Sequence, residues 1–168
     1  MFTANQRLSI SELNKETFIE RHSWKVLLII SSIIGLFGLG DIIQGMKADP
    51  AIAESITGID WEELQVSSPE MANLIDLQVR AGGAQLLIMS ILSSVVCLAG
   101  FRHGQKWAWY ALWVFPIWTA MVFLLFFTAT RQPDMPPPPP MLSAPIFFII
   151  AVLTLLLSYR KFSEAREA

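Results

Sequence analysis

Two residues of opposite charge lie at the ends of long apolar runs and are the first candidates for chemistry. Asp41 falls inside the run 26–46, and Arg80 immediately precedes the run 81–101. An ionisable side chain in lipid costs on the order of 2.5–3.5 kcal/mol at mid-membrane, so such a residue marks a functional site or finds a partner. We predict that Asp41 and Arg80 form an ion pair, with Gln44 and Gln85 as nearby hydrogen-bond partners.

This predicted cluster permits two interpretations. In the structural one, the pair fixes the register of two helices and closes one end of a helix bundle. In the functional one, Asp41, Gln44, Arg80 and Gln85 form the polar floor of an outward-facing pocket that binds a small polar molecule or a lipid headgroup. The sequence alone leaves both interpretations open.

Small residues recur at helical spacing beside these charges. In the first run Gly35 and Gly38 share a face with Asp41, and in the second run Gly83, Ser90 and Ser94 share a face with Arg80. Such faces let two helices approach closely within lipid, so these residues are predicted to be structural. Pro116, near the centre of the third run, is predicted to kink its helix, with Thr119 as one group that compensates for the missing hydrogen bond.

The elements that position these residues follow from composition. The chain is 54% hydrophobic and 15% charged, and its mean hydropathy is +0.50. Four apolar runs have the length of about 20 residues that a helix needs to cross lipid. We therefore predict an all-α fold, a four-helix transmembrane bundle forming one integral membrane domain over residues 1–168. The predicted spans are about 24–46, 79–101, 107–130 and 141–160.

Basic residues are divided unequally between the two sides of this arrangement. Cytoplasmic loops retain Lys and Arg, so the side that holds more of them is assigned to the cytoplasm. Both termini and the loop between the second and third runs carry nine of the 12 basic residues, against Lys47, Arg80 and Arg131 on the other side. The sequence predicts a multi-pass protein of the plasma (inner) membrane with both termini in the cytoplasm.

The two predicted outer loops differ in character. Loop 47–78 carries helix signals, namely Asp49 before Pro50, Gly58 as a terminator, Asp60 as a capping residue, and Ser68 before a proline, which begins a helix that runs into the second span. It is predicted to be a helical extracytoplasmic cap. Loop 131–141 contains five consecutive prolines, 136–140, and is predicted to be extended polyproline.

Several kinds of chemistry lack their residues. His22 and His103 lie outside the apolar runs, so haem held between spans is disfavoured. The intramembrane serines have no histidine or lysine at their depth to act as a base. With a formal net charge of −2 the chain offers no basic surface for nucleic acid. We expect no catalytic residue, no metal and no cofactor, which favours a protein that is not an enzyme.

Two short motifs carry a resemblance to a known group of proteins. They are Arg80-Ala81-Gly82-Gly83, which opens the second span, and the stretch 102–110, Arg-His-Gly-Gln-Lys-Trp-Ala-Trp-Tyr, at the turn into the third. Together they resemble small four-span prokaryotic membrane proteins, including DoxX-like ones. The resemblance implies a tight inner hairpin with an aromatic anchor and transfers no catalytic residue.

Two functions remain after these exclusions. The leading prediction is a non-catalytic accessory or assembly subunit in the lipid bilayer, which self-associates or packs against a membrane-protein partner through its small-residue faces. The alternative is a protein that binds or transports a small molecule or lipid through an outward-facing polar pocket around Asp41 and Arg80.

Overall fold

The computed structural model describes residues 18–129 and 137–163, and all regular elements in these ranges are helices. Four stretches are long and apolar enough to cross a membrane. They are α2 (Phe18–Gln44), α5 (Pro69–Ala99), α6 (Lys106–Ala111) together with α7 (Val114–Ala129), and α8 (Pro139–Ser163). The prediction of an all-helical chain with four such stretches is therefore confirmed.

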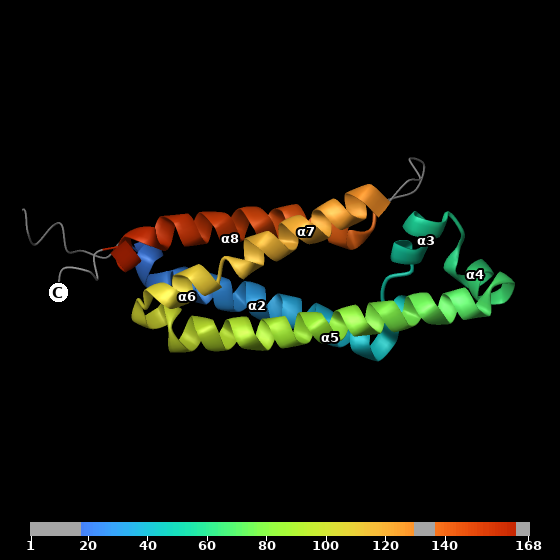
Figure 1. Ribbon diagram of the computed structural model, residues 1–168, viewed down its shortest axis with the longest axis horizontal. Helices are drawn as coiled ribbons and strands as arrows, with labels where there is room; N and C mark the ends of the chain where they lie inside the picture. The colour runs from blue at the N-terminus through green and yellow to red at the C-terminus, as the bar shows by residue number, and fades with distance from the viewer. Residues whose placement is uncertain (1–17, 130–136, 164–168) are drawn as a thin grey trace, which may run out of the picture.

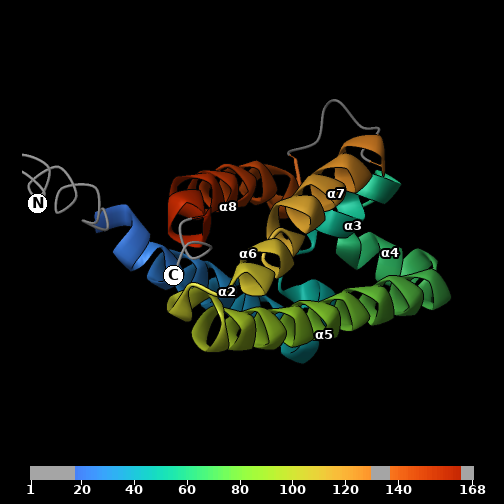
Figure 2. The same ribbon diagram turned by 60° about the vertical axis from the view of Figure 1, so that its left-hand side comes forward.

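The long helices are arranged as two pairs (Figures 1 and 2). One pair is formed by α2 and α5 and the other by α7 and α8, while α2 also packs along part of α8. The pairs are joined at the end that holds α6 and the 3₁₀ turn η2 (Phe101–His103), which we call the hairpin end. The opposite end, which holds α3 (Ala51–Thr57) and α4 (Trp61–Ser67), we call the loop end.

The main apolar core lies toward the hairpin end and joins the pairs. It is built from fully buried side chains of every long helix, among them Leu27, Phe101, Phe115, Leu155 and Phe162. The indole of Trp109 adds a hydrogen bond across this core, donating from Nε1 to the Leu155 carbonyl oxygen at 2.9 Å. This core therefore holds the two helix pairs together at the hairpin end and does not join them at the loop end.

The cap between the first two long helices follows the predicted signals in most respects. Gly58 ends α3 in the left-handed conformation with φ of 73°, which favours glycine. Asp60 caps α4 by accepting hydrogen bonds from the backbone N–H groups of Glu62 and Glu63. The helix predicted to begin after Ser68 begins at Pro69 and runs without a break through the second long stretch as the single helix α5, as predicted. A second small core beneath the cap contains Met46, Ala53, Trp61, Leu64 and Ala72.

The third long stretch agrees with its predicted span and is more strongly distorted than a kink. Lys106–Ala129 matches the predicted 107–130, and the distortion takes the form of a break between α6 and α7 at Leu112 and Trp113. Pro116 has no N–H to donate to the carbonyl oxygen of Leu112, four residues earlier, and that oxygen accepts from the Phe115 N–H instead. The Thr119 hydroxyl donates to the carbonyls of Phe115 and Pro116, so it does not replace the lost bond.

The proline-rich segment is helical at its end. Pro139 and Pro140 form the first turn of α8, where a missing N–H has no intrahelical acceptor and is tolerated. The predicted extended conformation is therefore wrong for these two residues. Pro137 and Pro138 precede the helix without regular secondary structure, and residues 130–136, where the beginning of the loop falls, lie outside the described part of the chain.

Candidate functional site

The four predicted ligand-binding residues do not form one cluster. Gln44 and Arg80 line a polar hollow at the loop end, whereas Asp41 lines a larger cavity between the helix pairs. Gln85 lines an apolar groove of about 330 Å³ between α5 and the break that separates α6 from α7. The predicted ion pair between Asp41 and Arg80 is wrong, because Arg80 pairs with Asp76, one turn earlier on its own helix.

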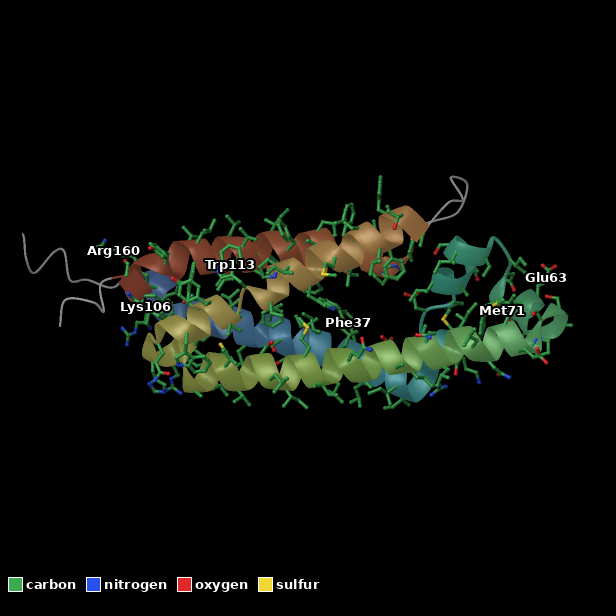
Figure 3. All side chains as sticks on the ribbon, in the orientation of Figure 1. Phe37, Glu63, Met71, Lys106, Trp113 and Arg160 are labelled. Carbon is green, nitrogen blue, oxygen red and sulfur yellow. The ribbon has the colours of Figure 1, made fainter. Side chains whose placement is uncertain are left out.

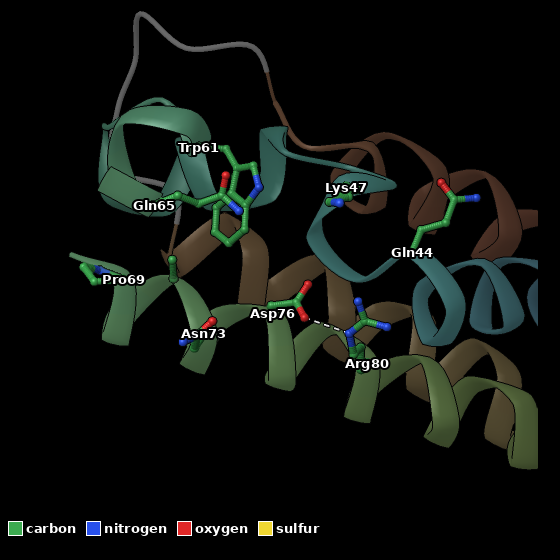
Figure 4. Close-up of a pocket in the computed structure, with 9 residues that line it drawn as sticks. Gln44, Lys47, Trp61, Gln65, Pro69, Asn73, Asp76 and Arg80 are labelled. Atoms are coloured by element: carbon green, nitrogen blue, oxygen red, sulfur yellow. Dashed lines mark hydrogen bonds and ion pairs between the residues drawn. The ribbon is translucent and has the colours of Figure 1, made fainter. Parts of the chain in front are cut away.

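Arg80 binds the end of the neighbouring helix as well as Asp76, and Figure 4 shows its ion pair with Asp76. Its Nε donates to Asp76 Oδ2 at 2.7 Å, and its Nη1 donates to the carbonyl oxygens of Ile42 at 2.6 Å and Ile43 at 3.2 Å. Both carbonyls lie in the last turn of α2, where the helix supplies no N–H partners and carries partial negative charge. The guanidinium therefore caps α2 from α5.

Asp76 fixes the chain directly after that cap. Its Oδ1 accepts a hydrogen bond of 2.8 Å from the Met46 N–H. Gly45 stands between the two contacts with φ of 58°, and a Cβ there would collide with the Asp76 carboxylate. The pair of Asp76 and Arg80 thus holds the turn η1 (Gly45–Lys47) against α5. This contact matches the structural interpretation of Arg80, with a different acidic partner.

The polar hollow beside this pair has a volume of about 250 Å³. Figure 4 shows Gln44, Lys47, Gln65 and Asn73 around it, with Trp61 forming part of its wall. The charges nearest to it, Asp76 and Arg80, already bind each other and the backbone. The hollow is therefore explained in part by the packing of the cap, and Lys47 is the lining charge for which the described residues provide no ion pair.

The two small-residue faces meet each other between α2 and α5. Ser31 and Ser90 exchange hydrogen bonds, each hydroxyl donating to the other residue's carbonyl oxygen at 2.8 and 2.6 Å, and Ser94 donates to the Ser31 hydroxyl. Further along, a Cβ on Gly83 would lie 2.7 Å from the Gly38 carbonyl oxygen. A Cβ on Gly35 would likewise meet Ser90. The faces are therefore occupied within the chain.

A larger cavity than the polar hollow lies between the two helix pairs toward the loop end. Its volume is about 420 Å³, within the range of about 300–1,000 Å³ typical of sites for small organic molecules. Most of its lining is apolar and comes from α2, α5, α7, α8 and the segment 48–52, including Ile34, Phe37, Ile52, Leu86, Trp118, Val122, Ala144 and Phe147. Asp41 and Asp49 are the charged residues among the described part of this lining.

Neither carboxylate is tied to another described group by a hydrogen bond or an ion pair. The sequence predicts Asp49 as the cap of α3, but the capping residue is Pro50 and no side chain caps this helix. Within the described ranges, neither the Asp41 nor the Asp49 side chain accepts a hydrogen bond or pairs with a cation. Burial, followed by the negative charges of Asp41 and Glu54, raises the pKa of Asp49 above its ordinary value.

This environment gives Asp49 an unusual effect on stability. Because its pKa is higher in the folded state than the ordinary 3.8, the ionised form destabilises the fold, and acidification toward 3.8 relieves that effect. We expect Asp49→Asn to raise the Tm at neutral pH and to change it little at acidic pH, near 3.8, where the Asp49 carboxyl is protonated in the folded protein. Thermal unfolding in one detergent at both pH values measures this. A gain that persists at acidic pH, or that exposed Glu62→Gln reproduces, contradicts the prediction.

Sequence reasoning did not place Asp49 in the cavity lining, because an acid before proline is the usual signal of a helix cap.

The resemblance to DoxX-like proteins places a tight hairpin at 102–110, where the chain turns through η2 and Gly104 with φ of 73°. No family model, no curated protein and no solved structure matches this chain. That resemblance therefore stays a prediction from two short motifs.

Proposed function

We propose that the protein is a non-catalytic, multi-pass membrane protein that binds a small amphiphilic molecule in the cavity between its helix pairs. The cavity carries this proposal, because it combines apolar walls with two carboxylates at one end. Binding sites for small molecules are commonly concave, mostly apolar and marked by a few convergent polar groups. An ionisable residue at the end of an apolar helix, such as Asp41, is a further indication of a functional site.

The proposed placement puts the hairpin end in the cytoplasm and the loop end outside. Basic residues described at the hairpin end support this orientation, and Figure 3 shows Lys106 and Arg160 there, with Glu63 at the opposite end. Helix α5 has 31 residues and is about 46 Å long, so it extends well beyond a hydrocarbon core of about 30 Å. The cavity then opens near the outer boundary of the lipid.

The other predicted function, that of an accessory or self-associating subunit, stays a prediction and has less support. Its motivation was the presence of small-residue faces on the first two long helices. Because Gly38 and Gly83 face each other inside the chain, those faces are not available to a second copy or another membrane protein. The cavity, by contrast, has no described side chain filling it.

A substitution that fills the cavity tests the proposed function. Gly40 lines the cavity, and a Cβ there would meet no atom within 4 Å, so Gly40→Leu places a side chain in the space without disturbing the backbone. Gly82 on α5 is equally open but lies outside the cavity lining, which makes Gly82→Leu the matched control. Native mass spectrometry of protein released from membrane-derived nanodiscs reports both copy number and retained small molecules.

We expect the wild type and Gly82→Leu to retain one small molecule per chain and Gly40→Leu to lose it. Equal retention by Gly40→Leu would place the molecule elsewhere and contradict the proposal. A bare oligomer, or a co-purifying protein without a small molecule, would favour the accessory subunit instead.

A further inference from the structure

We propose that the occupant of the cavity is a lipophilic cation, an apolar molecule with one positive charge that sits beside Asp41 and Asp49. This inference rests on the proposed function and adds the chemical class of the ligand. It follows from the charges in the cavity lining, from their lack of partners, and from the nature of the remaining walls.

Among the residues that the structure describes, the lining carries negative charge only. It contains Asp41 and Asp49 and no described Lys, Arg or His. Two basic residues described at the loop end, Lys47 and Arg80, line the separate polar hollow instead. Arg80 is committed to Asp76 and to the end of α2, so it does not neutralise Asp41. A negatively charged or doubly acidic ligand would be repelled from this cavity.

The two acids lie close enough to affect each other. The charge of Asp41 raises the pKa of Asp49, and Glu54 from α3 acts in the same direction. No described cation compensates the pair of cavity carboxylates. One monovalent cation between Asp41 and Asp49 would reduce their mutual repulsion and compensate part of their desolvation.

The walls favour a cation with an apolar body over a small hydrated ion. Phe37, Trp118 and Phe147 contribute aromatic rings, whose faces attract cations, and the other lining groups are mainly aliphatic. The cavity has a volume of about 420 Å³ and is lined mainly by apolar groups. A small inorganic cation would leave most of this volume unoccupied. A molecule that fills the apolar part and carries its charge at the loop end uses both features of the lining.

Two probes of the same shape and opposite charge test the inference. Tetraphenylphosphonium and tetraphenylborate are titrated onto the full chain in nanodiscs of zwitterionic lipid, and bound probe is counted by native mass spectrometry. We expect one tetraphenylphosphonium per chain and no tetraphenylborate. Asp41→Asn and Asp49→Asn are each expected to weaken tetraphenylphosphonium binding about tenfold or more, because close charge pairs couple strongly. Glu62→Gln, which removes an exposed charge outside the cavity, is expected to leave binding unchanged.

The outcomes separate this inference from the function on which it rests. Equal binding of the two probes, or full binding of tetraphenylphosphonium by both Asp variants, overturns the cationic ligand. If the endogenous molecule is nevertheless lost in Gly40→Leu, the cavity still binds an amphiphile and only the assignment of charge fails. If Gly40→Leu binds tetraphenylphosphonium as tightly as the wild type, the cavity is not the site and both proposals fail.

Discussion

Replacing Gly83 with leucine is expected to separate α2 from α5 and to give one of the two largest losses of stability among single substitutions in this chain. An added Cβ would lie 2.6 Å from the Asp41 Cβ, 2.7 Å from the Gly38 carbonyl oxygen and 3.0 Å from the Ile42 N–H nitrogen. Two of these three atoms belong to the backbone, so no side-chain rotation relieves the clash. Overpacking of this kind typically costs about 1–3 kcal/mol and sometimes more.

Gly82→Leu provides the matched control for this experiment. It lies on the same helix one residue earlier, gains the same helix propensity, and would meet no atom within 4 Å. We expect Gly83→Leu to lower the Tm strongly in mild detergent and Gly82→Leu to leave it unchanged or slightly higher. Similar Tm values for the two variants would show that α2 and α5 do not approach closely at Gly83.

The helices themselves could be predicted because their signals are local. Apolar runs of about 20 residues give the long helices, and Gly58, Asp60 and Pro69 set the boundaries of the cap. The small faces were also visible, since Gly38 and Gly83 recur at helical spacing with other small residues. Their assignment to each other, rather than to a second chain, required the structure.

The division into two helix pairs could not be predicted from the pattern. Each long helix is apolar on nearly all sides, so periodicity does not indicate which face meets which neighbour. The break before α7 is the form that the predicted kink takes. A proline removes the bond to the residue four positions earlier, so Pro116 disrupts the helix at Leu112 rather than at its own position.

The partner of Arg80 was within reach of sequence analysis. Asp76 lies four residues earlier on the same helix, at the spacing at which opposite charges face each other. The prediction gave preference to Asp41 because both residues lie at the same end of neighbouring spans. That choice joined two separate sites, the helix cap at Arg80 and the cavity at Asp41.

Arg80→Gln is expected to give the second large loss of stability, because this one side chain holds the end of α2 against α5. Removing it leaves the Ile42 and Ile43 carbonyls without their donor and Asp76 without its cation. Leaving such partly buried groups unsatisfied costs about 1–3 kcal/mol. Arg80→Lys keeps the charge but lacks the forked donors, so we expect it to restore only part of the stability.

Two double-mutant cycles distinguish the observed partner from the predicted one. Free energies of unfolding are measured by titration with a denaturing detergent for Arg80→Gln, Asp76→Asn, Asp41→Asn and the two double variants that contain Arg80→Gln. Residues in contact couple by about 0.5–3 kcal/mol, whereas residues without shared contacts are nearly additive. We expect coupling between Arg80 and Asp76 and additivity between Arg80 and Asp41. Coupling to Asp41 of the same size would return Arg80 to the cavity, neutralise one of its two acids, and remove the basis for a cationic ligand.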